Sequence, residues 1–293
     1  MRRTAEYPKL SMALVGRYAV LVLVGLVFVL PILFMLFSSL KPEDQLLRDT
    51  SSLRAFLPVG DISFNNYRDA FERVPITRFM LNSAFITTVT VAVGLFINSM
   101  AAFSFARLRW RARNSILSTI LATFIVPFQA IAIPLLLIVN ELPWFGLDGY
   151  STGWLNTYHV QIIPWIASPL QIFLFYQFFK DLPEELVEAA RIDGASSFQI
   201  YLRVIMPISG PVIATAVILR VLDMWNQFMW PLIVVQSEEY RPVMVGLQYF
   251  FQLDIAWAEI MAYLSLLTIP VLLVYLALQR TFIESIASTG VKG

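Results

Sequence analysis

Six long apolar windows, separated by short polar segments, constrain what this chain can fold into more than any other feature of its sequence. Five of them contain no Asp, Glu, Lys or Arg, and the window at 212–235 contains only Arg220 and Asp223. Each approaches or exceeds the length of about 20 apolar residues that spans the hydrocarbon core of a bilayer. The windows are 18–40, 81–106, 116–139, 160–179, 212–235 and 260–278. We therefore expect an all-α polytopic membrane protein with six transmembrane helices, in which residues 1–293 form a single transmembrane domain.

The scarcity of charge excludes an ordinary soluble domain. Charged residues make up 14% of the chain and hydrophobic residues 58%, whereas soluble domains carry roughly 25% charged residues. The absence of cysteine excludes disulfides and cysteine metal sites. The single histidine, His159, has no HExxH or carboxylate grouping beside it, so we expect no metal site. No string matches the phosphate-binding pattern GxxxxGK followed by Ser or Thr, so we expect neither a nucleotide site nor enzymatic activity in this chain.

Lysine and arginine residues in the loops predict the orientation of the helices. If the amino terminus is cytoplasmic, the inner side carries thirteen of them and the outer side seven, and Arg220 completes the 21 in the chain; this is the positive-inside arrangement. We expect the first window to stay as an uncleaved helix, because it is longer than the apolar region of a signal peptide and no small-residue cleavage site follows Leu40. Six spans then place both termini in the cytoplasm, residues 41–79 outside and residues 181–207 inside.

The inner segment 181–207 carries clear helix signals. Asp181 fits an N-cap, with Pro183 in the first turn and Glu184 three residues on. Gly194 fits the position after the helix, where a left-handed backbone favours a residue without Cβ. The segment therefore predicts a short surface helix that ends in a sharp turn.

A second helix is predicted immediately after this turn. Ser196 and Gln199 have the spacing of a capping box ahead of an apolar run, and Pro207 is expected to end that run. The second helix would return the chain to the membrane.

The same segment resembles a known family. Residues 188–197 read EAARIDGASS, and Ile205-Met206-Pro207 follows. This spacing resembles the EAA loop of binding-protein-dependent ABC importer permeases, which has a glycine four residues after the second alanine and a later apolar-Pro pair. The resemblance implies a cytoplasmic coupling helix gripped by an ATPase subunit. The residues that it assigns to this coupling are Glu188, Ala189, Ala190, Asp193, Gly194 and Pro207.

Further stretches look like the carbohydrate-uptake permeases related to the shorter subunit of the maltose transporter. They are Pro127 with Ile133-Pro134-Leu135, then Gln177 to Leu186, Trp225 to Leu232, and Gly290 to Gly293. The resemblance implies a type I ABC importer permease of a prokaryotic cytoplasmic membrane, which imports a sugar or sugar-like solute by alternating access. The implied partners are a second, different permease chain, two ATPase subunits that bind ATP and Mg, and an external solute-binding protein. No cofactor is expected in this chain, and no nucleic acid partner.

The carboxyl terminus departs from the family pattern. In that family the tail reads more like GLTxGAVKG and reaches into the ATPase dimer, whereas this chain ends in ESIASTGVKG, without the first glycine and the alanine before valine. The resemblance implies that Gly290, Lys292 and Gly293 contact the ATPase.

Polar residues gather in the fifth window, where they are costly unless they face protein or water. Arg220, Asp223 and Gln227 share one helical face, and Asn226 lies next to them. One interpretation is an Arg220–Asp223 pair that fixes helix packing. The other is a cavity wall that hydrogen-bonds the solute, with Trp225 or Trp230 stacked on a sugar face. Secondary candidates, for which interhelical hydrogen bonding is the alternative, are Asn82, Asn98, Ser99 and Gln129.

The resemblance leaves two classes of solute open, a sugar and a phosphorylated polyol such as glycerol 3-phosphate. Two other kinds of function are alternatives to the ABC importer. An ion-coupled secondary transporter would need carboxylates near the bilayer midplane, and Asp223 is the only acidic residue in that position. A membrane hydrolase would need a Ser/His or paired-carboxylate grouping at depth, and the windows contain none.

Overall fold

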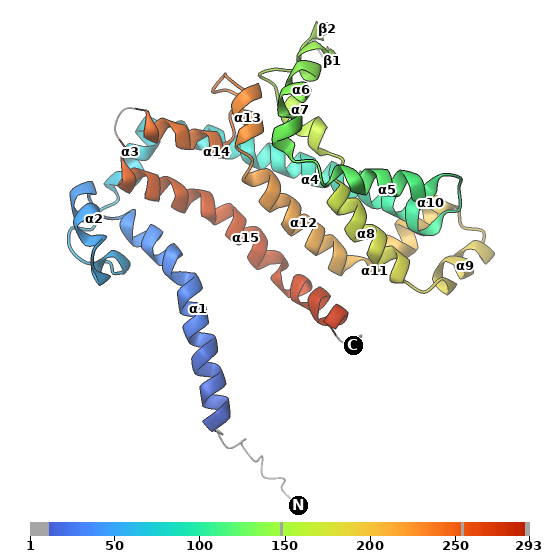
Figure 1. Cartoon of the computed structure of the whole chain (residues 1–293), viewed down its shortest axis with the longest axis horizontal. Coiled ribbons are helices and arrows are strands. Elements are labelled where there is room, and N and C mark those ends of the chain that lie inside the picture. Colours follow the sequence, from blue (N-terminus) through green and yellow to red (C-terminus); the bar gives the residue numbers. More distant parts are fainter. Residues whose placement is uncertain (1–11, 147–148, 253–254, 291–293) are drawn as a thin grey trace, which may run out of the picture. The chain divides into compact units, whose positions relative to one another are not determined.

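The computed structural model describes residues 12–146, 149–252 and 255–290, and almost all regular structure in them is helical (Figure 1). The expectation of an all-α chain is confirmed, with one short hairpin as the exception. Its strands pair antiparallel, with Pro143 opposite Thr152 and Gly146 opposite Gly149.

The elements follow one another in this order: α1 (Met12–Ser38), α2 (Glu43–Asp49), η1 (Leu53–Phe56), α3 (Asn65–Arg73), α4 (Ile76–Arg107), α5 (Arg113–Thr123), α6 (Phe128–Glu141), β1 (Pro143–Gly146), β2 (Gly149–Thr152), α7 (Tyr158–Ile162), η2 (Ile163–Trp165), α8 (Pro169–Asp181), α9 (Glu185–Ile192), α10 (Ser197–Ile200), η3 (Tyr201–Ile205), α11 (Met206–Ile208), α12 (Gly210–Trp225), α13 (Met229–Val234), α14 (Val243–Gly246), η4 (Leu247–Phe251) and α15 (Trp257–Gly290).

The chain separates into two compact units. Unit one comprises residues 1–74 and 249–266, and unit two comprises residues 75–248 and 267–293, each in its described part. The assignment of residues 1–293 to a single transmembrane domain stays a prediction.

Four helices in the described residues are long and apolar enough to cross a membrane: Leu14–Ser38, Ile76–Arg107, Tyr158–Asp181 and Trp257–Arg280. The number rises to six if each of two bent helix pairs counts as one span. Leu14–Ser38 has a mean hydropathy of 3.1 and none of its most apolar window is buried in the chain. Because apolar side chains avoid water, this helix requires lipid or another protein around it.

The third and fifth windows are not single straight helices. The chain bends by 101° between α5 and α6, in a break that contains Pro127. The fifth window is interrupted after Trp225, and α12 is itself bent by 83° from the helical segment Ser197–Ile208. The residue before a proline avoids the helical region, and a proline lacks the N–H of a helix interior, so the Pro127 break has a local cause.

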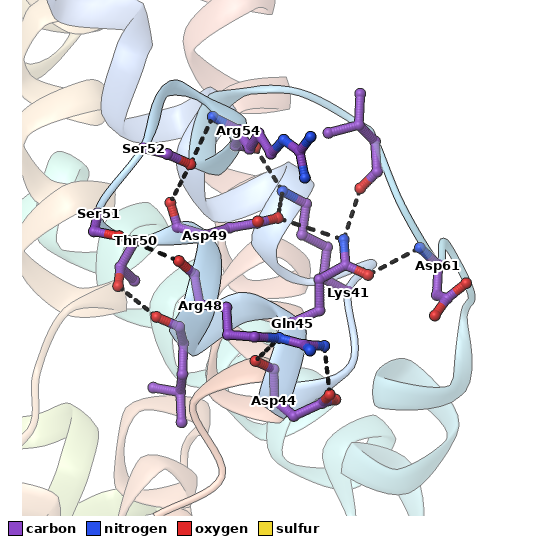
Figure 2. Close-up of polar contacts among 12 residues, drawn as sticks. Lys41, Asp44, Gln45, Arg48, Asp49, Thr50, Ser51, Ser52, Arg54 and Asp61 are labelled. Atoms are coloured by element: carbon purple, nitrogen blue, oxygen red, sulfur yellow. Dashed lines mark hydrogen bonds and ion pairs between the residues drawn. The ribbon is translucent and has the colours of Figure 1, made fainter.

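A buried lysine organises the segment after α1 in unit one (Figure 2). Lys41 is 1% exposed and donates hydrogen bonds to the Asp49 carboxylate, at 2.9 Å, and to the Arg54 carbonyl, at 2.6 Å. The lysine hydrogen bond holds the pKa of Asp49 below its usual value. Gln45 closes the segment, since its amide donates to the Val59 carbonyl and accepts from the Asp61 N–H. The segment is therefore a fixed structure rather than a loose connection.

The core of unit two lies between α4, α8, the segment 197–205 and α12. Large aromatic side chains fill it, among them Phe103, Phe175, Phe179 and Tyr201. A buried polar cluster lies beside this core: Asn98 of α4 donates to the Gln171 side chain at 2.9 Å and to the Ile166 carbonyl at 2.8 Å, and accepts from the Ser168 N–H. Gly94 allows this approach, because a Cβ there would lie 2.9 Å from the Ile166 oxygen.

Candidate functional site

The segment 181–207 forms a helix, a sharp turn and a second helix, as predicted, although its boundaries differ. α9 begins at Glu185 with Glu184 as its N-cap, and Asp181 is instead the last residue of α8. The prediction of Asp181 as N-cap was wrong, because the apolar run before it continues the helix up to the extended Leu182 that precedes Pro183.

The turn itself follows the local signals. Gly194 has a φ of +80°, and the Ala195 N–H donates to the Ala190 carbonyl at 2.9 Å. Both bonds of the Ser196–Gln199 capping box are present. Such left-handed closure favours glycine, and the box satisfies backbone N–H groups at the start of α10.

The sequence predicted that Pro207 would end the second helix, and the structure shows that it does not. The chain widens into a π-helix at Tyr201–Ile205 and continues through α11 to Ile208. A proline in a helix lacks one N–H and crowds the carbonyl four residues earlier, and a widened turn accommodates both effects. The break comes at Ser209 instead.

The loop 181–207 has one face in the core and one face outside. Val187, Ile200 and Tyr201 are buried in the core of unit two. Ile192 is 85% exposed and Phe198 is 52% exposed. Of the six residues assigned to coupling, Glu188, Ala189, Asp193, Gly194 and Pro207 are exposed and Ala190 is half-buried.

The loop is attached firmly to α4. The Tyr201 hydroxyl lies 2.8 Å from the Ser99 hydroxyl in a buried contact, and Arg107 donates to the Leu182 carbonyl. Because both anchors are on one long helix, a displacement of the loop would act on α4.

A cavity of about 850 Å³ lies at the bend between α5 and α6, against η2, α8 and α12. Arg220 and Asp223 line it, and Arg220 donates to the Asp223 carboxylate at 2.6 Å and to the Trp165 carbonyl. The Arg220 residue is 6% exposed, whereas 54% of the Asp223 side chain is exposed. The pair predicted from the sequence is therefore present, and it also borders a cavity.

The structure does not bring the other candidates of the fifth window to this cavity. Trp225 is buried and its indole N–H donates to the Leu267 carbonyl, and Trp230 is buried with a bond to the Val160 carbonyl. Asn226 bonds to the Leu222 carbonyl of its own helix, and the Gln227 amide lies against the Met224 sulfur.

Three secondary candidates make hydrogen bonds between segments. Asn82 donates to the carbonyls of Glu239 and Arg241, while Asn98 and Ser99 make the contacts given above. Gln129 is exposed at the start of α6.

Sequence reasoning missed the aromatic lining of the cavity. Phe124, Phe128 and Trp165 line it, and the Phe128 and Trp165 ring centroids lie 5.0 Å apart. The sequence signal nearest to it was Pro127, which lies in the break of the third window.

The part of the chain that the structure describes contains no group of three His, Cys, Asp or Glu side chains that could hold a metal ion. His159 stacks on Trp144, with ring centroids 4.0 Å apart. Lys292 and Gly293 lie outside the described residues, and Gly290 is the last residue of α15.

The family described as binding-protein-dependent transport system inner membrane component matches residues 94–287. This chain belongs to that family. The match includes the loop 181–207 and the cavity. The chain is therefore a multi-pass membrane protein with the fold of a type I ABC importer permease.

Relatives and solved structures agree with this assignment. The arabinooligosaccharides transport system permease protein AraQ of Bacillus subtilis is 31% identical over 98% of each chain. The sn-glycerol-3-phosphate transport system permease protein UgpE of Brucella suis is 31% identical over 93% of this chain and 95% of that protein. A chain in the crystal structure of a bacterial ABC transporter involved in import of the acidic polysaccharide alginate superposes with a TM-score of 0.74, at 21% identity, over 95% of this chain and 100% of that chain. That likeness shows the fold.

Proposed function

We propose that this chain is the transmembrane subunit of an ATP-driven importer for a sugar or sugar-like solute. The observation that carries the proposal is the loop 181–207, which has an exposed apolar face, a glycine turn and two anchors on α4. The similarity to AraQ, an arabinooligosaccharides transport system permease protein, supports a carbohydrate as the solute. ATP and Mg bind to partner ATPase subunits, and an external binding protein delivers the solute to this chain and a second, different permease.

The coupling residues act at the ATPase. The exposed side chains of Ile192 and Phe198 enter a groove of the ATPase subunit, and Gly194 sets the angle between the two helices of the loop. The tail residues Gly290, Lys292 and Gly293 contact the same subunit. Both termini lie in the cytoplasm, and the outer segment 41–79 faces the binding protein.

Hydrogen bonds on either side of the α4 backbone support transmission from this loop to the cavity. Tyr201 contacts Ser99, and the adjacent Asn98 holds Gln171. The Gln171 amide reaches the Ala216 carbonyl of α12, at 3.4 Å, one turn before Arg220. Closure of the ATPase dimer displaces the loop, and α4, α8 and α12 follow as a connected group. Alternating access of the cavity is the result.

The runner-up solute is a phosphorylated polyol, because UgpE is named for sn-glycerol 3-phosphate and is also 31% identical to this chain. An ion-coupled secondary transporter is the other alternative, and it would require no ATPase.

Co-purification and reconstitution test the proposal. An affinity-tagged chain should recover an ATPase subunit and a second permease from native membranes. Proteoliposomes with the whole complex and its binding protein should import solute only with ATP, while the purified single chain should neither bind nor hydrolyse ATP. ATP hydrolysis by the single chain, or uptake driven by an ion gradient without ATPase, would contradict it.

Orientation has a separate test. Because the natural sequence has no cysteine, Ser197→Cys and Asp61→Cys can each be labelled without background in intact cells. An impermeant maleimide should label Asp61→Cys and leave Ser197→Cys unlabelled until the membrane is opened. The reverse pattern would overturn the proposed topology.

A further inference from the structure

We infer that the cavity at the α5–α6 bend is a binding site for a neutral, polyhydroxylated solute, and that it discriminates against anions. This inference rests on the proposed function, and it names which of the two open solute classes the chain accepts. The cavity has about 850 Å³, within the range of roughly 300–1,000 Å³ that small-molecule sites occupy.

The charge of Arg220 is committed to the protein itself. Its guanidinium donates to the Asp223 carboxylate and to the Trp165 carbonyl, and its Nε is buried without a partner. The Arg220 side chain is 7% exposed. Arginine binds carboxylates and phosphates best through two N–H groups side by side, and burial leaves little of this guanidinium open to a solute.

The charged group that the cavity presents is a carboxylate. The Asp223 side chain is half exposed, and only one of its oxygens receives the arginine bond. Among the described residues that line the cavity, Arg220 and Asp223 are the only charged ones. A phosphate would approach a like charge, whereas a sugar can donate hydroxyl protons to the carboxylate.

An aromatic wall lies in the same cavity. Phe128 and Trp165 form a contacting pair, and Phe124 extends from the break between the two helices with 64% of its surface exposed. Aromatic faces offer a large apolar surface with a defined geometry, and the C–H faces of a sugar ring match it. A half-exposed carboxylate beside such a wall suits a molecule with hydroxyl edges and apolar faces.

Equilibrium binding to the assembled transporter tests the inference. The complex is placed in nanodiscs without its binding protein, in ATP-free and vanadate-trapped states, and titrated with radiolabelled arabinotriose or sn-glycerol 3-phosphate. Arabinotriose should bind in one of the two states, and sn-glycerol 3-phosphate should bind in neither.

Two variants with matched controls locate the site. Phe124→Ala should weaken arabinotriose binding by about tenfold, while Ile125→Ala should not, because Ile125 is 82% exposed and does not line the cavity. Asp223→Asn should weaken binding by about tenfold or more, and Asp61→Asn, on the outer segment, should have no effect. Phe124 is largely exposed, so its variant keeps the test valid if Asp223→Asn does not fold.

The outcomes separate this inference from the proposed function. ATP-dependent sugar uptake that is unaffected by Phe124→Ala and Asp223→Asn would overturn the inference and leave the proposed function intact. Preferential binding of sn-glycerol 3-phosphate would also overturn it. Loss of complex assembly in Phe124→Ala would make the cavity a subunit interface instead. Absence of any ATP-dependent uptake would refute the proposed function itself.

Discussion

Substitutions of Gly194 separate the strain of the turn from the fit of the coupling loop against the ATPase. Gly194 has a φ of +80°, and a Cβ built on it meets no atom within 4 Å. Alanine and leucine therefore pay the same backbone cost within this chain, about 1–2 kcal/mol for a left-handed L-residue. That cost shifts the local equilibrium of the turn by a factor of about 5–30. Asparagine tolerates this conformation better and should be milder.

We attribute any additional loss in Gly194→Leu over Gly194→Ala to contact with the ATPase, because Gly194 is exposed and a Cβ there meets no atom of this chain. We expect Gly194→Ala to lower solute import per ATP hydrolysed, and Gly194→Leu to lower both this ratio and the affinity for the ATPase subunit. Membrane insertion and expression should be unchanged in both variants. The assay is uptake and phosphate release by the reconstituted complex, with ATPase affinity measured by biolayer interferometry.

Gly149→Ala is the matched control. Gly149 has a φ of +104° and equally open space, but it lies in the β1–β2 hairpin and outside the loop 181–207. The control should show similar strain and normal coupling. If Gly194→Leu imports solute as efficiently as the wild type, the reasoning that puts this glycine at the coupling turn is refuted.

Three further predictions concern buried polar contacts. Asp223→Leu should cost about 3–5 kcal/mol of unfolding free energy, because it leaves a buried guanidinium uncompensated, whereas Arg220→Leu should cost about 1–3 kcal/mol, because the half-exposed carboxylate stays hydrated. Thermal unfolding of the purified variants measures both losses of stability. The double variant should be about as stable as Arg220→Leu. Equal losses of stability in the two single variants, with no recovery in the double variant, would contradict the structure. Tyr201→Phe should reduce import per ATP hydrolysed with a stability loss of only about 1 kcal/mol, and an unchanged ratio would count against transmission through its hydroxyl. The pKa of Asp49 is lowered in the folded chain, so the ionised carboxylate stabilises the fold above the unfolded pKa, near 3.8, and this stabilisation is lost as the pH falls through the folded pKa. Asp49→Asn should therefore lower the melting temperature at pH 7 and make that temperature fall less steeply in acid. Asp44→Asn, in an exposed ion pair, should do neither.

Local chemistry determined much of the coupling loop from the sequence alone. A capping box needs residues three apart, and a left-handed turn needs a residue without Cβ, so Ser196, Gln199 and Gly194 could be read without any tertiary contact. The membrane class was equally accessible, because charge-free windows of this length have few other uses. The family resemblance added the role of the loop.

The path of the helices and the lining of the cavity depended on tertiary structure. Asp181 is a plausible cap in isolation, but the preceding helix continues to it. The sequence predicts Trp225 as a stacking surface for a sugar, whereas its indole is buried and donates to a carbonyl 42 residues away. Arg220 has its second partner 55 residues away, at Trp165. Whether a polar side chain in a membrane span faces solute, lipid or protein is decided by contacts between distant segments, and hydrophobic periodicity carries no information on them.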